Sequence, residues 1–418
     1  MRLCHHLHLA YCTNVHRGET WPETFGALQT HTLAVRERVC PRHPFAIGLR
    51  LSHQAAAGLS DPSALSAFRR WLDENDCYVF TINGFPYGQF HGTRVKEQVY
   101  QPDWTTPERL DYTCRLFDIL AKILPAGLAG SVSTLPGSFK PFLRSQAQEK
   151  QIRDHLWRCV EQVARLSEQT GRLLHLGLEP EPLCLFENSR ETIRFFEELR
   201  AEHPKDDRLN TCLGVNYDTC HFAVEFEEPR DALGALTGAG IRISKIHLSS
   251  ALKIRSAPSV WSPAFTRPPE AGTPNRHGLN ARPKLELEAL REFDDEVYLH
   301  QVVIRDANGQ LRFFRDLADA LAAPDARART QDPAEWRIHF HVPLHATPAS
   351  PFENTNDHLL GVLDVLAANP GLCPYLEMET YTWEVLPPEF KARNIVEQLA
   401  AEYDWTLARL RERGLASR

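Results

Sequence analysis

Leu213-Gly-Val-Asn-Tyr-Asp218-Thr-Cys-His221 decides the fold prediction, because a short apolar run ends in polar side chains suited to chemistry. Seven other short apolar runs recur along the chain. They alternate with longer segments whose apolar residues lie three and four positions apart, as on one face of a helix. The eight predicted strands are, in chain order, Leu7–Cys12, Ala46–Ser52, Tyr78–Asn83, Gly130–Thr134, Leu173–Glu179, Leu213–Tyr217, Ile241–Leu248 and Tyr375–Thr380.

Eight strands with interleaved helices predict an α/β fold, a (β/α)₈ TIM barrel, as one domain over residues 1–418. An open, doubly wound sheet that binds a dinucleotide is the alternative. No Gly-x-Gly-x-x-Gly follows the first predicted strand, so that alternative lacks its main signature.

The bulk composition is typical of a globular protein, with 43% hydrophobic and 24% charged residues. A net charge of −7 disfavours a surface that neutralises phosphates, so we expect no nucleic-acid partner. The sequence has neither a signal peptide pattern nor an apolar stretch long enough to span a membrane. We therefore expect a cytoplasmic protein without membrane insertion. The 10 cysteines form no Cys-x-x-Cys pair, which predicts buried thiols rather than a zinc ribbon.

Residues 250–345 interrupt the alternation between the seventh and eighth strands. Within them, Val297–Arg305 and Gln310–Phe314 flank Asp306-Ala-Asn-Gly309, which is a good hairpin turn. We expect this segment to be an insertion that forms a lid or hairpin, because insertions after barrel strand ends commonly build active-site lids.

A further strand is predicted at Trp336–Leu344. It could replace Tyr375–Thr380 as the eighth barrel strand, which would leave the latter outside the barrel. The insertion is the favoured interpretation.

Polar residues follow four of the predicted strands, at the ends that converge on the catalytic face of a barrel. Carboxylate oxygens with one imidazole nitrogen suit Mn²⁺, Mg²⁺, Co²⁺ or Zn²⁺, so we expect a divalent metal as cofactor. The candidate ligands are Glu179, Glu181, Asp218, His247, Glu377 and Glu379.

Each of these residues also has an ordinary structural explanation. Asp218 could cap a following helix, and His247, between Ile246 and Leu248, could be a core histidine. The order Glu, Asp-x-x-His, His, Glu on successive strands favours the metal site.

This order resembles the xylose isomerase-like TIM-barrel superfamily, which contains sugar isomerases, epimerases, inosose dehydratases and endonuclease IV. The resemblance implies that Asp218 and His247 are metal ligands and that His221 is a substrate contact or an additional ligand. The segment Glu181-Pro-Leu-Cys-Leu-Phe-Glu187 resembles the epimerase pattern and favours Glu181, whereas strand length leaves Glu179 open. Glu379 is favoured over Glu377 because it lies nearer the strand's end.

The chain also resembles a narrower group, the EboE-type metabolite traffic proteins. The supporting segments are Tyr11–Trp21, Asn83–Gly92, Gln101–Thr105 and Glu379–Trp383. This resemblance implies a sugar phosphate isomerase- or epimerase-like protein of secondary metabolism, and it does not supply the reaction.

Further polar residues lie where a barrel places its substrate contacts. The predicted substrate-binding residues are Asn14, His16, Asn83, His91, Lys245, His300 and His341. Asn14 and His16 could instead form a capped turn. The histidines around His341, including His339, are expected to contact substrate or pack the hairpin in preference to binding a second metal.

The expected reaction is metal-assisted proton transfer next to a carbonyl, in isomerisation, epimerisation or dehydration of a sugar or cyclitol. Its catalytic groups would be Glu179, Glu181, Glu379 and His221. One alternative is a non-catalytic protein that binds or escorts a metabolite. Another is an endonuclease IV-like phosphodiesterase, which the net charge disfavours.

Overall fold

The barrel predicted from the sequence is present in the structure, a computed structural model that describes residues 1–418 except 256–288, 324–333, 389–390, 392 and 418. Its strands are β1 (His8–Tyr11), β2 (Phe45–Arg50), β3 (Cys77–Asn83), β4 (Gly130–Thr134), β5 (Leu174–Leu178), β6 (Leu213–Asp218), β7 (Arg242–Leu248) and β13 (Tyr375–Met378). They form one parallel sheet in the order β1-β13-β7-β6-β5-β4-β3-β2. An isolated parallel bridge between Cys12 and Gly48 joins β1 to β2 and nearly closes the barrel.

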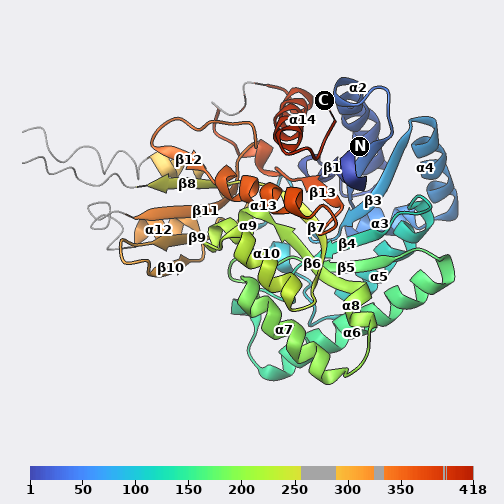
Figure 1. The fold of residues 1–418 in the computed structure, drawn as a ribbon, viewed down its shortest axis with the longest axis horizontal. Helices are drawn as coiled ribbons and strands as arrows, with labels where there is room; N and C mark the ends of the chain where they lie inside the picture. Colours follow the sequence, from blue (N-terminus) through green and yellow to red (C-terminus); the bar gives the residue numbers. More distant parts are fainter. Residues whose placement is uncertain (256–288, 324–333, 389–390, 392, 418) are drawn as a thin grey trace, which may run out of the picture.

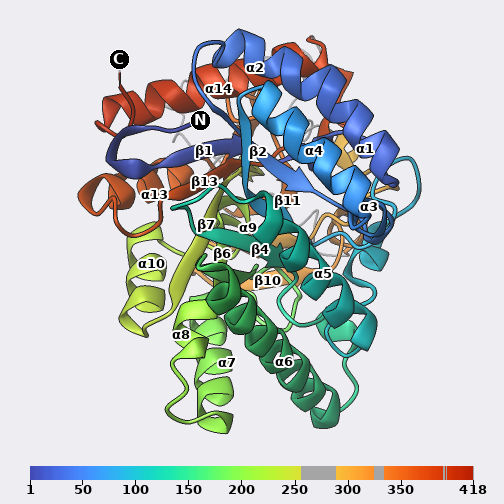
Figure 2. The same cartoon turned by 90° about the vertical axis from the view of Figure 1, so that its right-hand side faces the viewer.

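Helices surround this sheet (Figure 2). They are α1 (Trp21–Ala27), α2 (Leu33–Val39), α3 (His53–Leu59), α4 (Pro62–Glu74), α5 (Pro107–Ile123), α6 (Gln146–Thr170), α7 (Ser189–Glu202), α8 (Arg208–Cys212), α9 (Thr219–Val224), α10 (Pro229–Gly238), α13 (Asn356–Ala368) and α14 (Ile395–Glu412). In α6, the apolar stripe Ile152, Leu156, Cys159 and Val163 is fully buried, as its spacing predicts. None of the helices in the described ranges is long and apolar enough to cross a membrane.

A second, antiparallel sheet lies beside the barrel (Figure 1). Its strands are β8 (Ala251–Arg255), β9 (Val302–Arg305), β10 (Leu311–Phe314), β11 (Glu335–His341) and β12 (Phe352–Asn354), in the order β10-β9-β11-β8-β12. A short helix, α12 (Leu317–Ala322), follows β10.

The second sheet settles the assignment of the eighth barrel strand. β13 pairs with β1 and β7, whereas β11 pairs with β8 and β9 outside the barrel. The insertion between the seventh and eighth strands is therefore confirmed, and the predicted hairpin is the β9–β10 pair. The parts of the predicted insertion at 256–288 and 324–333 lie outside the described residues. β8 is not evident from the apolar pattern, because only two residues separate it from the end of β7.

β11 separates its side chains by face, as a strand must. Trp336, Ile338 and Phe340 are buried in the apolar core of the second sheet. His339 and His341 alternate with them and therefore point to the opposite face, where their rings lie beside His221 of α9. The second sheet thus presents imidazoles to the barrel.

Candidate metal centre

Four of the predicted ligands converge at the carboxyl ends of the barrel strands. Glu179 directly follows β5, Asp218 ends β6, His247 lies in β7 and Glu379 directly follows β13. One ligand atom from each lies within 4.8 Å of all the others, and all four residues are buried. From His247 Nδ1, Glu179 Oε1 is 3.1 Å away, Asp218 Oδ2 is 3.3 Å away and Glu379 Oε2 is 3.2 Å away.

The spacing of these atoms fits a divalent cation. Ligand atoms at 2.0–2.1 Å from a tetrahedral ion lie about 3.3 Å from one another. Glu179 Oε2 and Asp218 Oδ2 are buried, and neither has a hydrogen-bond partner among the described residues. Three buried carboxylates around one imidazole are costly without a compensating positive charge, which a divalent ion supplies.

The orientation of His247 is fixed from behind by Glu377. His247 Nε2 donates a hydrogen bond to Glu377 Oε2 at 2.7 Å, which leaves the lone pair on Nδ1, facing the three carboxylates. A carboxylate that accepts from the rear nitrogen is the usual support of a metal-binding histidine. Gly48 of β2 makes room for Glu377, because a Cβ there would collide with Glu377 Oε1 and with the carbonyl oxygen of Tyr11.

Glu377 is itself paired with Lys245, and both side chains are fully buried. Burial alone would raise the pKa of Glu377, but Lys245 and His247 outweigh it and hold that pKa at about 2. Glu377 therefore remains a charged partner of His247 and Lys245, and it stands outside the group of four.

Asp218 uses its two oxygens differently. Oδ1 caps α9 by accepting hydrogen bonds from the backbone N–H groups of Cys220, at 2.7 Å, and His221, at 3.3 Å. Ser249 Oγ donates to the same oxygen at 2.5 Å. The helix cap proposed as the ordinary role of Asp218 is thus present, and Oδ2 remains directed toward His247.

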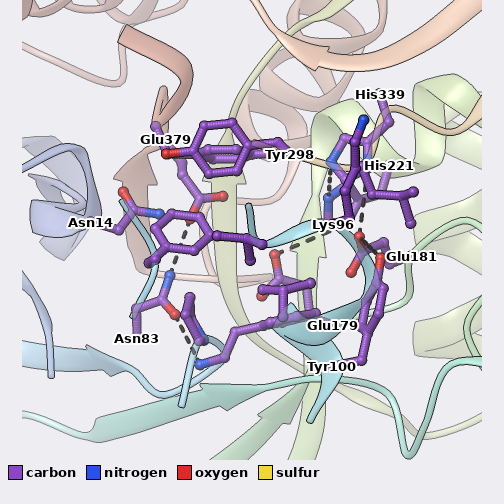
Figure 3. A pocket seen from close by; sticks show the side chains of 17 residues that line it. Asn14, Asn83, Lys96, Tyr100, Glu179, Glu181, His221, Tyr298, His339 and Glu379 are labelled. Atoms are coloured by element: carbon purple, nitrogen blue, oxygen red, sulfur yellow. Dashed lines mark hydrogen bonds and ion pairs between the residues drawn. The ribbon is translucent and has the colours of Figure 1, made fainter. Parts of the chain in front are cut away.

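A cavity opens above this centre (Figure 3). Glu179 and Glu379 line it, together with Asn14 and Asn83 on one side. Both asparagines donate to Glu379 Oε1, Asn14 at 2.7 Å and Asn83 at 3.1 Å. The two amides therefore face the cavity and also orient Glu379.

Glu181 lies on the cavity wall, outside the group of four. Tyr100 donates its hydroxyl hydrogen to Glu181 Oε1 at 2.7 Å, and burial raises the pKa of Glu181 to about 7. His221 and His339 flank it, and each offers a nitrogen to a possible ligand group with Glu181.

The other predicted substrate contacts do not line this cavity. In the described part of the chain, His16, His91, Lys245, His300 and His341 are absent from the cavity lining. Tyr11 bonds to His16 at 2.9 Å, whereas His91 joins the Asn14 carbonyl oxygen to the Tyr298 hydroxyl. His300 bonds to Asp295 and to the carbonyl oxygen of His339.

Several cavity residues were not predicted from the sequence. They are Lys96, Tyr100, Tyr298 and Tyr381. Lys96 is buried and pairs with Asp316 at 2.7 Å. His339, which the sequence analysis named with His341, also lines the cavity, and alternation along the predicted strand places these two histidines on one face.

Among the comparisons with known proteins, only the search of solved structures found similar chains, and the similarity is one of fold. No protein-family model matches the sequence, and no curated protein does. Similar solved structures include an L-ribulose 3-epimerase, with 11% identity over 99% of this chain and 96% of that one and a TM-score of 0.48. The IOLI protein with a zinc atom has 11% identity over 97% and 98% of the two chains and a TM-score of 0.45. A D-tagatose 3-epimerase-like protein has 14% identity over 57% and 74%, with a TM-score of 0.38. Such low values say nothing about the reaction, and the EboE-type resemblance stays a prediction.

Proposed function

We propose that this chain is a metal-dependent isomerase or epimerase that moves a proton at a carbon next to a carbonyl in a small sugar, sugar phosphate or cyclitol. The observation that carries the proposal is the arrangement at the cavity floor. Four ligands converge there, and a separate carboxyl group, Glu181, faces the same space. The pathway, secondary metabolism of the EboE type, rests on the sequence resemblance alone.

Glu179, Asp218, His247 and Glu379 would hold Mn²⁺, Mg²⁺, Co²⁺ or Zn²⁺. Such an ion stabilises the negative charge that develops on the substrate oxygens when the neighbouring carbon loses its proton. Three oxygen ligands and one nitrogen ligand are compatible with all four metals.

Glu181 is the group that we assign to proton transfer. Tyr100 and Gln301 hold its carboxyl group at the wall, and neither of its neighbours Pro180 and Pro182 has a backbone N–H to compete for it. A carboxyl group that faces the substrate without being held by the ion is free to accept a proton and return it.

The remaining walls suit a carbon skeleton that carries hydroxyl groups. Phe85, Phe90, Tyr298 and Tyr381 exclude water from one side, whereas Asn14 and Asn83 present amides at the floor.

Hydrogen exchange tests the proposal directly. The metal-loaded protein is incubated in D₂O with a panel of ketoses, ketose phosphates and inososes, and deuterium at the carbon next to the carbonyl is followed by NMR. We expect exchange with at least one compound, and we expect Glu181→Gln to abolish it while metal content is unchanged.

The control is Glu187→Gln, on the same loop, where Glu187 pairs with Lys140. An inert protein with its metal bound would overturn the proposed reaction. Exchange that survives Glu181→Gln would overturn the role of that residue.

A further inference from the structure

The cavity above the candidate metal centre has two chemically different parts. The floor carries carboxylates and the amides of Asn14 and Asn83, whereas another part of the wall consists of apolar side chains. Figure 3 shows the ring of Tyr298 on one side of the cavity and the carboxylate of Glu179 on the other. The apolar side chains of this wall are Phe85, Pro86, Phe90, Val95, Val99 and Leu299.

The apolar wall is one packed unit. Phe90, Val95 and Tyr298 are buried together, and Val99 and Tyr381 pack against them. The ring centroid of Phe90 lies 5.2 Å from that of Tyr298 and 5.3 Å from that of Tyr381. These residues come from the segment between β3 and α5, from the insertion and from the segment after β13. The wall is therefore assembled by the fold from three separate parts of the chain.

Hydrogen bonds hold this wall in place and direct its polar groups away from the cavity. The backbone N–H groups of Val95 and Lys96 both donate to the carbonyl oxygen of Val297, at 2.8 Å each. His91 Nε2 lies 2.5 Å from a backbone carbonyl oxygen, so in the neutral ring Nδ1 accepts from the Tyr298 hydroxyl at 2.6 Å. His91 does not line the cavity, so the hydroxyl of Tyr298 is satisfied outside it.

The charges around the cavity do not favour a phosphate group. Among the residues that the structure describes, Lys96 is the one lysine or arginine in the lining. Its ammonium group already donates to Asp316 at 2.7 Å and to the carbonyl oxygen of Asp295 at 2.8 Å. The carboxylates at the floor repel a phosphate, and in the proposed function the metal centre binds the reacting oxygens.

We infer that the substrate is an uncharged polyhydroxy compound that carries an apolar substituent, an aryl or alkyl group, beside its reacting end. A hydroxyl or phosphate group against the apolar wall would lose its hydrogen bonds to water without gaining new ones. An apolar group gains from burial there, and an aromatic group also gains from contacts with the rings of Phe90 and Tyr298. The inference rests on the proposed function, which places the reacting carbon at the metal centre, and it removes sugar phosphates from the range of substrates.

Binding calorimetry with matched probes tests the inference without requiring turnover. The metal-loaded full chain is titrated with the O-methyl, O-hexyl and O-benzyl ethers of fructose and of an inosose, and with a fructose phosphate. We expect the hexyl or benzyl ether of at least one compound to bind at least roughly 10-fold more tightly than its methyl ether. The fructose phosphate should bind more weakly than these ethers. The larger gain tells whether the substituent is alkyl or aryl.

Val99→Lys places a cation in the apolar wall, where the Val99 side chain is half-buried. We expect this variant to lose the preference for the hexyl or benzyl ether and to bind the fructose phosphate more tightly than the parent does, with metal content unchanged. Gln98→Lys is the matched control, because it adds the same charge one residue earlier, at an exposed position that does not line the cavity. It should bind all probes as the parent does. If circular dichroism shows that Val99→Lys is unfolded, Val99→Thr, which keeps the shape and adds a hydroxyl group, should reduce the preference.

The outcomes separate this inference from the proposed reaction. Equal binding of the three ethers, tightest binding of the fructose phosphate, or no binding of any probe overturns the inference. A preference that survives both Val99 variants overturns it too, because the apolar group then binds elsewhere. Deuterium exchange into an unsubstituted ketose without any preference for apolar ethers leaves the proposed reaction standing. A preference that Val99→Lys removes, without exchange into any compound, supports the apolar subsite and overturns the reaction.

Discussion

Two clusters of buried side chains differ in the elements that supply them: the candidate metal centre of Glu179, Asp218, His247 and Glu379, and the histidine cluster of His221, His339 and His341. The first takes all four from the ends of barrel strands, which the parallel sheet holds in register. The second takes two of its three histidines from β11, a strand of the added sheet. The barrel alone therefore builds one centre, whereas the other exists only while the added sheet keeps its position against the barrel.

The clusters also differ in charge. Three carboxylates dominate the first, and Lys245 balances the charge of the further carboxylate, Glu377, behind it. In the second, burial lowers the pKa of His339 and of His341, which keeps both rings neutral.

Asp218→Asn should give the largest effect, because Asp218 Oδ2 faces both clusters. Asn keeps a side-chain oxygen for the cap of α9 and loses the charge. We expect metal binding at the candidate metal centre to weaken by at least roughly 100-fold, more than changes behind the ligands typically cause. Calorimetric metal titration measures the change. Asp61→Asn is the control, because Asp61 caps α4 in the same way far from any ligand. An unchanged metal affinity would show that Asp218 is not a ligand.

The sequence predicts the first cluster better than the second for a geometric reason. Parallel barrel strands place their ends together, so Asp218 and His247 follow from strand order. Glu379 lies one residue beyond β13 and joins the four, as its place near the strand end predicts. The choice between Glu179 and Glu181 has no such basis, because both lie beyond the last residue of β5.

The second cluster depends on packing between two sheets. His221 and His339 are 118 positions apart, and no strand register connects them. Alternation along β11 indicates that His339 and His341 share a face, but the partner of that face is set by how the second sheet docks on the barrel. That docking depends on side-chain contacts spread over both sheets.

Lys245→Met should give the next largest effect. It removes the buried cation that lies behind the ligands supplied by the barrel strands. The substitution leaves Glu377 buried without its cation, and breaking such a pair typically costs about 3–5 kcal/mol. Denaturant unfolding of the metal-free protein should show a loss of this size in the free energy of unfolding. Lys245→Met/Glu377→Gln should recover most of it, because no unpaired charge remains. A loss below about 1 kcal/mol would contradict the pairing.

Glu402→Gln examines the connection between the two regions. Glu402 Oε1 accepts from the backbone N–H of Leu344, after β11, and from Thr380 Oγ1, after β13. Burial raises the pKa of Glu402 to about 7, above its unfolded value of about 4.3. This carboxyl group therefore stabilises the fold fully below pH of about 4.3, and the contribution is lost as pH rises through 7.

The parent should lose on the order of 2–3 kcal/mol of unfolding free energy between about pH 5 and pH 8 from this residue. Glu402→Gln keeps an oxygen for both hydrogen bonds and cannot ionise, so its stability should vary less with pH. Denaturant melts at several pH values compare the two. An unchanged slope would mean that Glu402 is already ionised in the folded protein, whereas Glu412→Gln, at the end of α14, should match the parent.

The smallest effect should come from Glu377→Gln made in the Lys245→Met background, where no buried charge is left unpaired. Gln still accepts from His247 Nε2, but it makes the ring a weaker ligand than a carboxylate does. Loss of such support typically weakens metal binding between about 10- and 100-fold. We expect that loss at the candidate metal centre, because His247 is one of its four candidate ligands. Lys253→Met/Glu353→Gln removes an ion pair of the second sheet and should leave the affinity unchanged. An unchanged affinity in the Glu377→Gln variant would mean that the carboxylate behind His247 does not support metal binding, and the position of the ring would then depend on its barrel strand alone.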